Sequence, residues 1–249
     1  MALVTTDAII LQTFKYSDTS KILRLITRSR GMQSVIAKGA LRPKSQFGGI
    51  LEPFIEGVVT FQARDNRDLH TLTHFELTRS RQRLGEDLVR FGGASLIAEL
   101  VMRSGIEEPD AELYERIRDS LDVIQDASKE RAESIVLGET WALIAQLGFA
   151  PSLQDCIECG RGLAPEEDVS FDYGAGGVRC QNCSHGLPGR TLPAHARDAL
   201  IRLMVGEHVV LERTAAHWRL LARFLAHHVL EGGSLKSLAF LAETLGDAE

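Results

Sequence analysis

Four cysteines, the full complement of the chain, lie in two closely spaced pairs. Cys156 and Cys159 form one Cys-x2-Cys pair, Cys180 and Cys183 form the other, and twenty residues separate the pairs. A two-residue gap lets both sulfurs of a tight turn face one ion, and two such turns complete a tetrahedron. The spacing therefore predicts one metal site made of four thiolates, with zinc as the expected ion.

The competing interpretation joins the same cysteines in two disulfides. The N-terminus, Met1 to Asp7, has neither the basic stretch nor the apolar stretch of a secretory signal. No run of residues reaches membrane-spanning length. We therefore expect a cytoplasmic protein, in which thiols stay reduced. Because four thiolates leave no open position for water, we expect a structural ion and not a catalytic one.

Charge is distributed unevenly along the chain. The 249 residues carry a formal net charge of −6, which by itself argues against binding to nucleic acid. Residues 1–51, however, hold eight basic residues against two acidic ones, a net charge of +6. The N-terminal region is therefore the candidate for contact with a polyanion.

The N-terminal region also has the pattern of a small β-barrel. Short apolar segments are interrupted by turn residues, which is typical of an all-β domain. Five strands in about 75 residues suit an OB barrel, whose strand face and loops bind oligonucleotides. The expected strands are residues 8–16, 21–27, 32–38, 54–62 and 69–77.

A basic loop follows the third expected strand. It contains Lys38, Arg42 and Lys44, two of them flanking a proline. A groove that follows a phosphate backbone needs such charges, together with aromatic residues for base stacking. Phe14, Tyr16 and Phe47 are the nearby aromatic residues, and we expect Phe14 to lie in the core. A solvated loop without a ligand is the alternative.

After residue 80 the apolar period changes from two to about 3.6, which predicts helices. Helices are expected from about residue 88 to 104, and over 110–125, 130–147, 194–205, 214–230 and 234–245. The four-cysteine segment lies between the third and fourth of these. Residues 107–139 carry a net charge of −7, and we interpret them as a solvated face or a surface for a basic protein.

The sequence lacks the common catalytic motifs. It contains no P-loop, no G-x-G-x-x-G, no H-E-x-x-H and no G-x-S-x-G. This absence favours a binding protein over an enzyme.

Several stretches together resemble the RecO family of bacterial recombination mediators. The stretches Ala37–Ala40, Lys44–Ser45 and Leu51–Phe54 are similar to the N-terminal signature of that family. The run Leu147–Pro151 leading to Cys156, and the pattern around Phe171, Gly176–Gly177 and Cys180, are similar to its C-terminal part. The resemblance covers nearly the whole chain.

The resemblance implies a fold and a function. It implies a protein of mixed α and β structure with an OB-fold domain at 1–80, an α-helical domain at 81–150 and 190–249, and an inserted zinc module at 151–189. RecO-like proteins bind single- and double-stranded DNA and anneal complementary strands. With RecR they help RecA to replace single-strand-binding protein on DNA, in the bacterial cytoplasm and at the nucleoid. The family's zinc is structural, and its barrel is the main DNA-binding unit.

Carried to this sequence, the resemblance implies specific site residues. The zinc ligands are Cys156, Cys159, Cys180 and Cys183, and the expected DNA contacts are Lys21, Arg24, Lys38, Arg42 and Lys44. The net negative charge of the chain argues against a large contribution of the helical domain to DNA binding.

Family members also hold the acidic, apolar-ended tail of single-strand-binding protein. Arg219 and Arg223, four residues apart on one helix face and near Trp218, Leu221 and Phe224, are the candidate tail site. The alternative is that both arginines cap or pair with the acidic helices.

Two other functions remain open. A zinc-ribbon protein that binds RNA or acts in transcription would share the barrel and the cysteine turns. A zinc hydrolase would need an open metal position, which four thiolates oppose.

Overall fold

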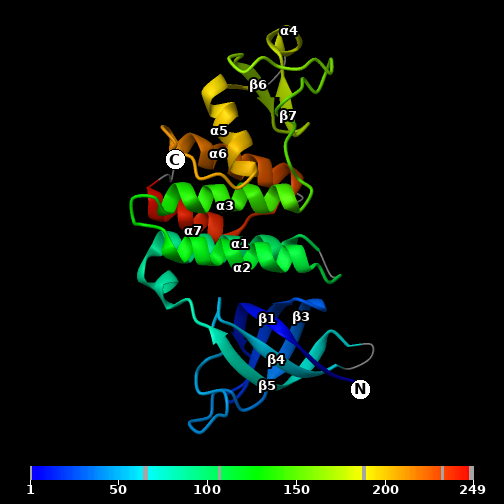
Figure 1. The fold of residues 1–249 in the computed structure, drawn as a ribbon, viewed down its shortest axis with the longest axis vertical. Helices are drawn as coiled ribbons and strands as arrows, with labels where there is room; N and C mark the ends of the chain where they lie inside the picture. The colour runs from blue at the N-terminus through cyan, green and yellow to red at the C-terminus, as the bar shows by residue number, and fades with distance from the viewer. Residues whose placement is uncertain (1, 64–66, 106–107, 187–188, 231–232, 247–249) are drawn as a thin grey trace. The chain divides into compact units, whose positions relative to one another are not determined.

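The computed structural model describes residues 2–63, 67–105, 108–186, 189–230 and 233–246 (Figure 1). The chain forms two compact units. The first comprises Met1–Glu86 and Ile97–Asp126, and the second comprises Asp87–Leu96 and Ala127–Glu249. Helix α1 (Leu88–Arg103) contributes its first half to the second unit and its second half to the first.

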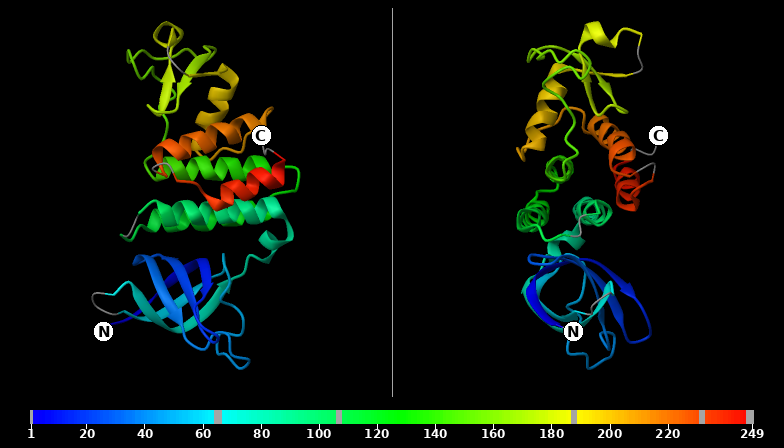
Figure 2. Two further views of the ribbon diagram at one scale, coloured as in Figure 1. Left: turned by 180° about the vertical axis from the view of Figure 1, so that it is seen from behind. Right: turned by 90° about the vertical axis from the view of Figure 1, so that its right-hand side faces the viewer.

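Five strands of the first unit pair in the closed order β1-β2-β3-β5-β4 and form a barrel, which Figure 2 shows in two orientations. Every pairing is antiparallel except that between β3 and β5. The strands are β1 (Ala2–Lys15), β2 (Lys21–Thr27), β3 (Gly31–Ala37), β4 (Glu56–Ala63) and β5 (Leu69–Arg79).

The barrel interior follows from the alternation of side chains along each strand. In β2, for example, Leu23 and Leu25 are buried in the barrel core, whereas Arg24 between them is exposed. The long connection between β3 and β4 also contributes to this core, through Phe47 and Leu51. This connection thus fills the barrel from one end while its polar residues remain outside.

A buried arginine joins the barrel to helix α2 (Ala111–Asp126), which belongs to the same unit. Arg81 lies just before the short 3-10 helix Gln82–Glu86, and its side chain is fully buried. Its guanidinium group donates to Glu56 of β4 at 2.7 Å, to Asp122 of α2 at 2.6 Å and to the carbonyl of Phe54 at 3.0 Å. One side chain therefore ties together three segments of the unit.

The second unit is built from helices around α3 (Ala132–Gln146), whose Trp141 is completely buried. Helix α3 packs against α5 (Ala194–Met204) and α6 (Thr214–His228). Helix α7 (Lys236–Leu245) passes close to α1 at Gly92, where an added Cβ would lie 2.7 Å from Leu241. Glycine is therefore required there for close approach of the two helices.

The four-cysteine segment forms a small sheet in the order β7-β6-β8, next to the short helix α4 (Gln181–Ser184). Its strands are β6 (Val169–Asp172), β7 (Gly177–Arg179) and β8 (Arg190–Leu192).

The five N-terminal strands and the six longer helices are all found, with ends shifted by a few residues. Strand β1 begins six residues before the predicted residue 8, because its first half pairs with β4. The predicted stripe of α1 is wrong at its start, since Leu88 and Phe91 are 62% and 43% exposed. The strands of the four-cysteine segment were not predicted.

Replacing Arg81 with alanine should strongly destabilise the first unit. The substitution leaves the carboxylate of Glu56 without its cation and Asp122 with only the half-exposed Arg79, and loss of one partner of a buried ion pair costs about 3–5 kcal/mol. Denaturant unfolding combined with hydrogen exchange of barrel amides measures this cost.

The matched control is Arg83→Ala. Arg83 pairs with Asp126 at 3.0 Å, but both side chains are more than half exposed, so the cost should stay below about 1 kcal/mol. Equal destabilisation by the two substitutions would contradict the role assigned to Arg81.

Candidate metal centre and nucleic-acid interface

The side chains of the four cysteines converge on one point. The sulfur atoms of Cys156, Cys159, Cys180 and Cys183 all lie within 4.8 Å of one another. A tetrahedral zinc ion with Zn–S bonds of about 2.3 Å places its sulfurs about 3.8 Å apart, so the donor set fits such an ion in number, type and spacing. The cluster can therefore hold a metal ion.

Backbone hydrogen bonds shape both cysteine turns. The amide of Gly160 donates to the carbonyl of Cys156 at 2.8 Å, and Gly160 has a φ of +69°, which favours glycine. The amide of Cys183 likewise donates to the carbonyl of Cys180 at 3.1 Å. Across the two turns, the amide of Cys180 donates to the sulfur of Cys156 at 3.3 Å.

These amides also favour ionised sulfur. Burial opposes ionisation of Cys156, but hydrogen bonds from the backbone of Cys159, Cys180 and Glu158 outweigh it and lower the pKa of Cys156 to about 6. The backbone of Cys183, and after it the guanidinium of Arg161, lower the pKa of Cys180. Both effects favour the thiolate form that binds metal.

The four-cysteine segment is bonded to the helices of the second unit. Asp168 accepts a hydrogen bond at 2.9 Å from the amide of Ala194, the first residue of α5. The Nε2 group of His228 in α6 donates to the carbonyl of Tyr173 at 2.7 Å, and the guanidinium of Arg223 lies 5.5 Å from the centre of the Tyr173 ring. The segment therefore shares its stability with α5 and α6.

Lys38, Arg42 and Lys44 lie together in the connection that follows β3, and all three are exposed. Gly39, with a φ of +73°, starts the turn, and the amide of Arg42 donates to its carbonyl at 3.1 Å. The amide of Leu41 donates to the carbonyl of Thr19 at 3.0 Å, which fixes the loop to the β1–β2 turn. Within the described residues, none of the three cations forms an ion pair.

The other two predicted DNA contacts differ from each other. Lys21 donates to Glu52 at 2.6 Å and to the carbonyl of Leu51 at 3.2 Å, and its side chain is only 16% exposed. It is thus engaged within the protein. Arg24 is exposed on the outer face of β2 and has no ion-pair partner in the described parts of the chain.

The aromatic residues of this region correct one expectation. Phe14, which we expected in the core, is 43% exposed, and Tyr16 is 61% exposed. Phe47, which we considered for base stacking, is only 3% exposed because it fills the barrel core. The pairing of β1 with β2, which the sequence did not define, turns Phe14 outward, whereas Phe47 enters the core from the connection between β3 and β4.

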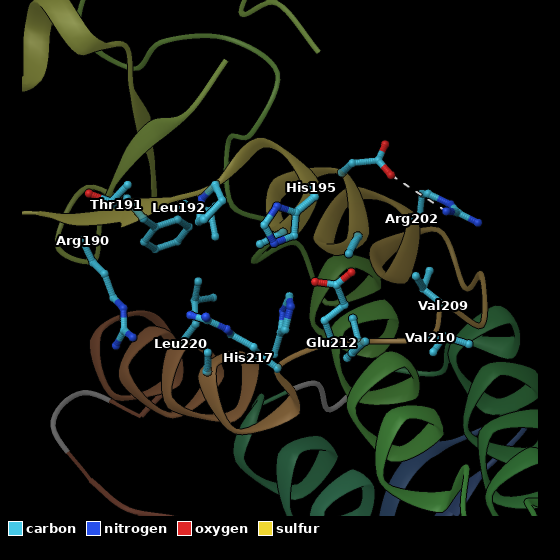
Figure 3. Close-up of a pocket in the computed structure, with 18 residues that line it drawn as sticks. Arg190, Thr191, Leu192, His195, Arg202, Val209, Val210, Glu212, His217 and Leu220 are labelled. Carbon is cyan, nitrogen blue, oxygen red and sulfur yellow. Dashed lines mark ion pairs between the residues drawn. The ribbon is translucent and has the colours of Figure 1, made fainter. Parts of the chain in front are cut away.

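Arg219 and Arg223 both lie exposed on α6, but the apolar residues expected beside them are buried. Trp218, Leu221 and Phe224 are at most 6% exposed. A cavity of about 520 Å³ lies between α6, α5 and β8 (Figure 3). Arg190, His195, Arg213, His217 and Leu220 are among the residues that line it.

None of the helices in the described part of the chain combines the length and the apolar composition that crossing a membrane requires.

The sequence matches two family models, which together cover most of the chain. Residues 1–81 match the model of the recombination protein O N terminus, and residues 85–239 match that of its C terminus. A DNA repair protein RecO from Nocardioides sp. is 32% identical over 94% of this chain and 97% of its own length. A second, from Anaeromyxobacter sp., is 33% identical over 96% of both chains. A third, from Bacillus pumilus, is 30% identical over 81% of this chain and 76% of its own length.

Proposed function

Because the chain belongs to the recombination protein O (RecO) family, we propose that it is a DNA-binding mediator of recombinational repair. It binds single- and double-stranded DNA and anneals complementary strands. With RecR it helps to load RecA onto DNA coated by single-strand-binding protein, and it is not an enzyme. The observation that carries this proposal is the group of exposed cations at the N-terminal barrel, in the part that matches the family's N-terminal model.

The proposal assigns a role to each region. The barrel, residues 1–80, is an OB-fold DNA-binding domain, since OB folds are five-stranded barrels whose strand face and loops bind oligonucleotides. Residues 81–150 and 190–249 form the helical domain, and residues 151–189 form the zinc module. The protein acts in the cytoplasm, at the nucleoid.

Lys38, Arg42, Lys44 and Arg24 are the proposed DNA contacts. They are exposed and lie on one loop and the adjoining strand, so that they can follow a phosphate backbone. Lys21 contributes less, because it is already paired with Glu52.

The triple substitution of Lys38, Arg42 and Lys44 by alanine should weaken binding to single-stranded DNA and abolish annealing. Because each contact is to phosphate, the dependence of affinity on salt should also fall, by roughly 0.7 per contact removed in a plot of log affinity against log salt. Fluorescence anisotropy over a salt series measures both quantities, and oligonucleotide annealing with and without single-strand-binding protein tests the function.

Lys129→Ala is the control, since it removes an exposed lysine outside the barrel. Unchanged affinity and salt dependence in the triple variant would move the DNA contacts elsewhere. Tighter binding to RNA than to DNA of the same sequence would favour the alternative function in RNA binding or transcription.

The metal that the cysteine cluster holds is one structural zinc ion. Supporting this assignment are the four thiol ligands and their spacing. Zinc would cross-link the two cysteine turns through Cys156, Cys159, Cys180 and Cys183.

Cys156→Ser should reduce the zinc content and loosen residues 151–189 together with the start of α5 and the end of α6. Zinc binding in small modules contributes on the order of 10 kcal/mol to folding. Metal analysis of protein purified without chelator and hydrogen exchange measure the two effects. His185→Ala, which changes an exposed neighbour of Cys183 outside the cluster, should retain zinc. Absence of zinc from the unsubstituted protein would contradict the assignment.

The helical domain is the proposed location of a surface that binds a protein partner. We propose that Arg219 and Arg223 border the site for the acidic tail of single-strand-binding protein, because charge steers such a peptide and burial of its apolar end retains it. The cavity beside α6 is the alternative receptor, since Arg190 and Arg213 line it together with apolar residues.

Charge reversal separates the two sites. In titrations with a labelled tail peptide, Arg219→Glu with Arg223→Glu should weaken binding roughly tenfold, equivalent to about 1.4 kcal/mol. The matched pair Arg190→Glu with Arg213→Glu should change it little. If only the second pair weakens binding, the tail lies in the cavity and the assignment to Arg219 and Arg223 is wrong.

A further inference from the structure

The strand register places a row of apolar side chains on the outside of the barrel. Phe14 of β1 pairs with Ile22 of β2, Ile22 pairs with Ile36 of β3, and Ile36 pairs with Thr71 of β5. Residues directly opposite in neighbouring strands share one face and lie about 5 Å apart at Cβ. The adjacent residues Leu23, which follows Ile22, and Val35, which precedes Ile36, are completely buried in the barrel core. The row therefore faces away from that core.

Solvent reaches this row most clearly at its aromatic end. Phe14 is 43% exposed, and Tyr16, two residues later at the β1–β2 turn, is 61% exposed. The amide of Tyr16 donates to the carbonyl of Ser20 at 2.9 Å, which fixes the backbone at this point. Two rings are thus held on a rigid hairpin with much of their surface in water.

The far end of the row is hollowed. A shallow cavity of about 430 Å³ lies between the ends of β3 and β5 and is lined by Ile36, Lys38, Arg67, Asp68, Leu69 and Thr71. It combines apolar walls with two cations and one acid.

Three cations near the row have no ion-pair partner among the described residues. Arg24 is two residues after Ile22 on β2, Lys38 is two residues after Ile36, and Arg67 lines the hollow. Two described acids lie nearby, Asp18, which lies 3.5 Å from Lys15, and Asp68. The three described cations without an ion-pair partner complement a polyanion that also carries flat apolar groups.

We propose that this face, with Phe14 and Tyr16 as stacking residues, binds the unpaired bases of single-stranded DNA and gives the barrel its preference for single strands over duplex. The inference rests on the proposed DNA binding and adds to it the part of the ligand that is recognised. Aromatic side chains stack on any base, whereas bases in a duplex are already stacked on their neighbours. The cations alone hold the phosphates of either form.

Two groups of residues on this face would therefore contribute to DNA affinity in different ways. Lys38, Arg42 and Lys44 contribute salt-dependent affinity that is common to both forms of DNA. Phe14 and Tyr16 contribute affinity that depends little on salt and is confined to single strands. Removal of the rings and removal of the cations should therefore give different results.

Phe14→Ala and Tyr16→Ala should each weaken binding to a single-stranded oligonucleotide of mixed sequence by about fivefold to 150-fold, the range observed for loss of one stacked base. Affinity for a duplex of the same length and the salt dependence of both should stay unchanged. The control is Leu77→Ala, because Leu77 lies on β5 with a matched exposure of 42%. Because Phe14 is outside the core, the Phe14→Ala protein should unfold at the normal temperature.

Phe14→Trp provides an independent readout. The two native tryptophans, Trp141 and Trp218, are 0% and 6% exposed, so the new ring would dominate quenching by added ligand. Its fluorescence should be quenched by single-stranded DNA and not by duplex. The variant should also keep the single-strand affinity that Phe14→Ala loses.

Three outcomes overturn the proposal. Equal losses of single-strand and duplex affinity would show that the rings only support the loop that holds phosphate. Unchanged DNA affinity together with weakened binding to purified RecR would assign the face to a protein contact. Unchanged affinity for both would leave the face without a ligand role. In all three the unsubstituted protein still binds DNA; if it binds neither form, the proposed function itself fails.

Discussion

Closure of the five-stranded barrel is the constraint on which the proposed DNA-binding region depends. In the order β1-β2-β3-β5-β4, the strand that follows β3 in sequence cannot pair with it and must instead reach the free edge of β1. The connection between β3 and β4 is therefore long. It uses this length in two ways: Phe47 and Leu51 fill the barrel core, and Lys38, Arg42 and Lys44 stay outside as a cationic loop.

The last pairing, between β3 and β5, is parallel and extends over only three residue pairs. It nevertheless fixes which residues of β3 face outward, because a shift by one residue would turn every side chain to the other face. Ile36 and Lys38 consequently lie on the same outer face as Phe14. Closure thus produces both the loop and the exposed apolar row from one arrangement of strands.

The second unit depends on a different stabilising device. The described residues of 151–186 and 189–192 contribute few large apolar side chains to a core, among them Phe171, which is fully buried and lies 6.3 Å from the ring of Phe224 in α6. Cross-linking by a metal ion replaces the missing apolar core in segments of this size. Asp168 is hydrogen-bonded to α5 and Tyr173 to α6. Loss of order around the four cysteines would therefore also loosen these two helices, which carry the cavity and Arg223.

The sequence predicted the features that depend on local pattern and missed those that depend on register. Paired cysteines at fixed spacing, short strands and helical stripes such as Leu113, Ile117 and Leu121 are local signals, and the structure has the four sulfurs together and that stripe buried. Whether Phe14 enters the core depends on the face of β1 that it occupies once β1 pairs with β2, and Phe47 reaches the core from the connection between β3 and β4. The sequence also could not predict the hydrogen bond from Lys21 to Glu52, because the two residues are 31 positions apart.

The acidic helix α2 shows how a chain with net negative charge can still present a cationic surface. We expected residues 107–139 to form a solvated face or a surface for a basic protein, and within the first unit three of their acids pair with arginines of the barrel and its connection. Glu115 pairs with Arg28, Asp122 pairs with Arg79 and Arg81, and Asp126 pairs with Arg83. These arginines are thereby neutralised where α2 meets the barrel. Among the described cations for which the structure has no such partner are Arg24, Lys38, Arg42 and Lys44 of the outer β2–β3 face and its loop. Since charges are screened beyond about 10 Å at 0.1 M salt, a polyanion at this surface would respond to these local cations and not to the charge of the whole chain.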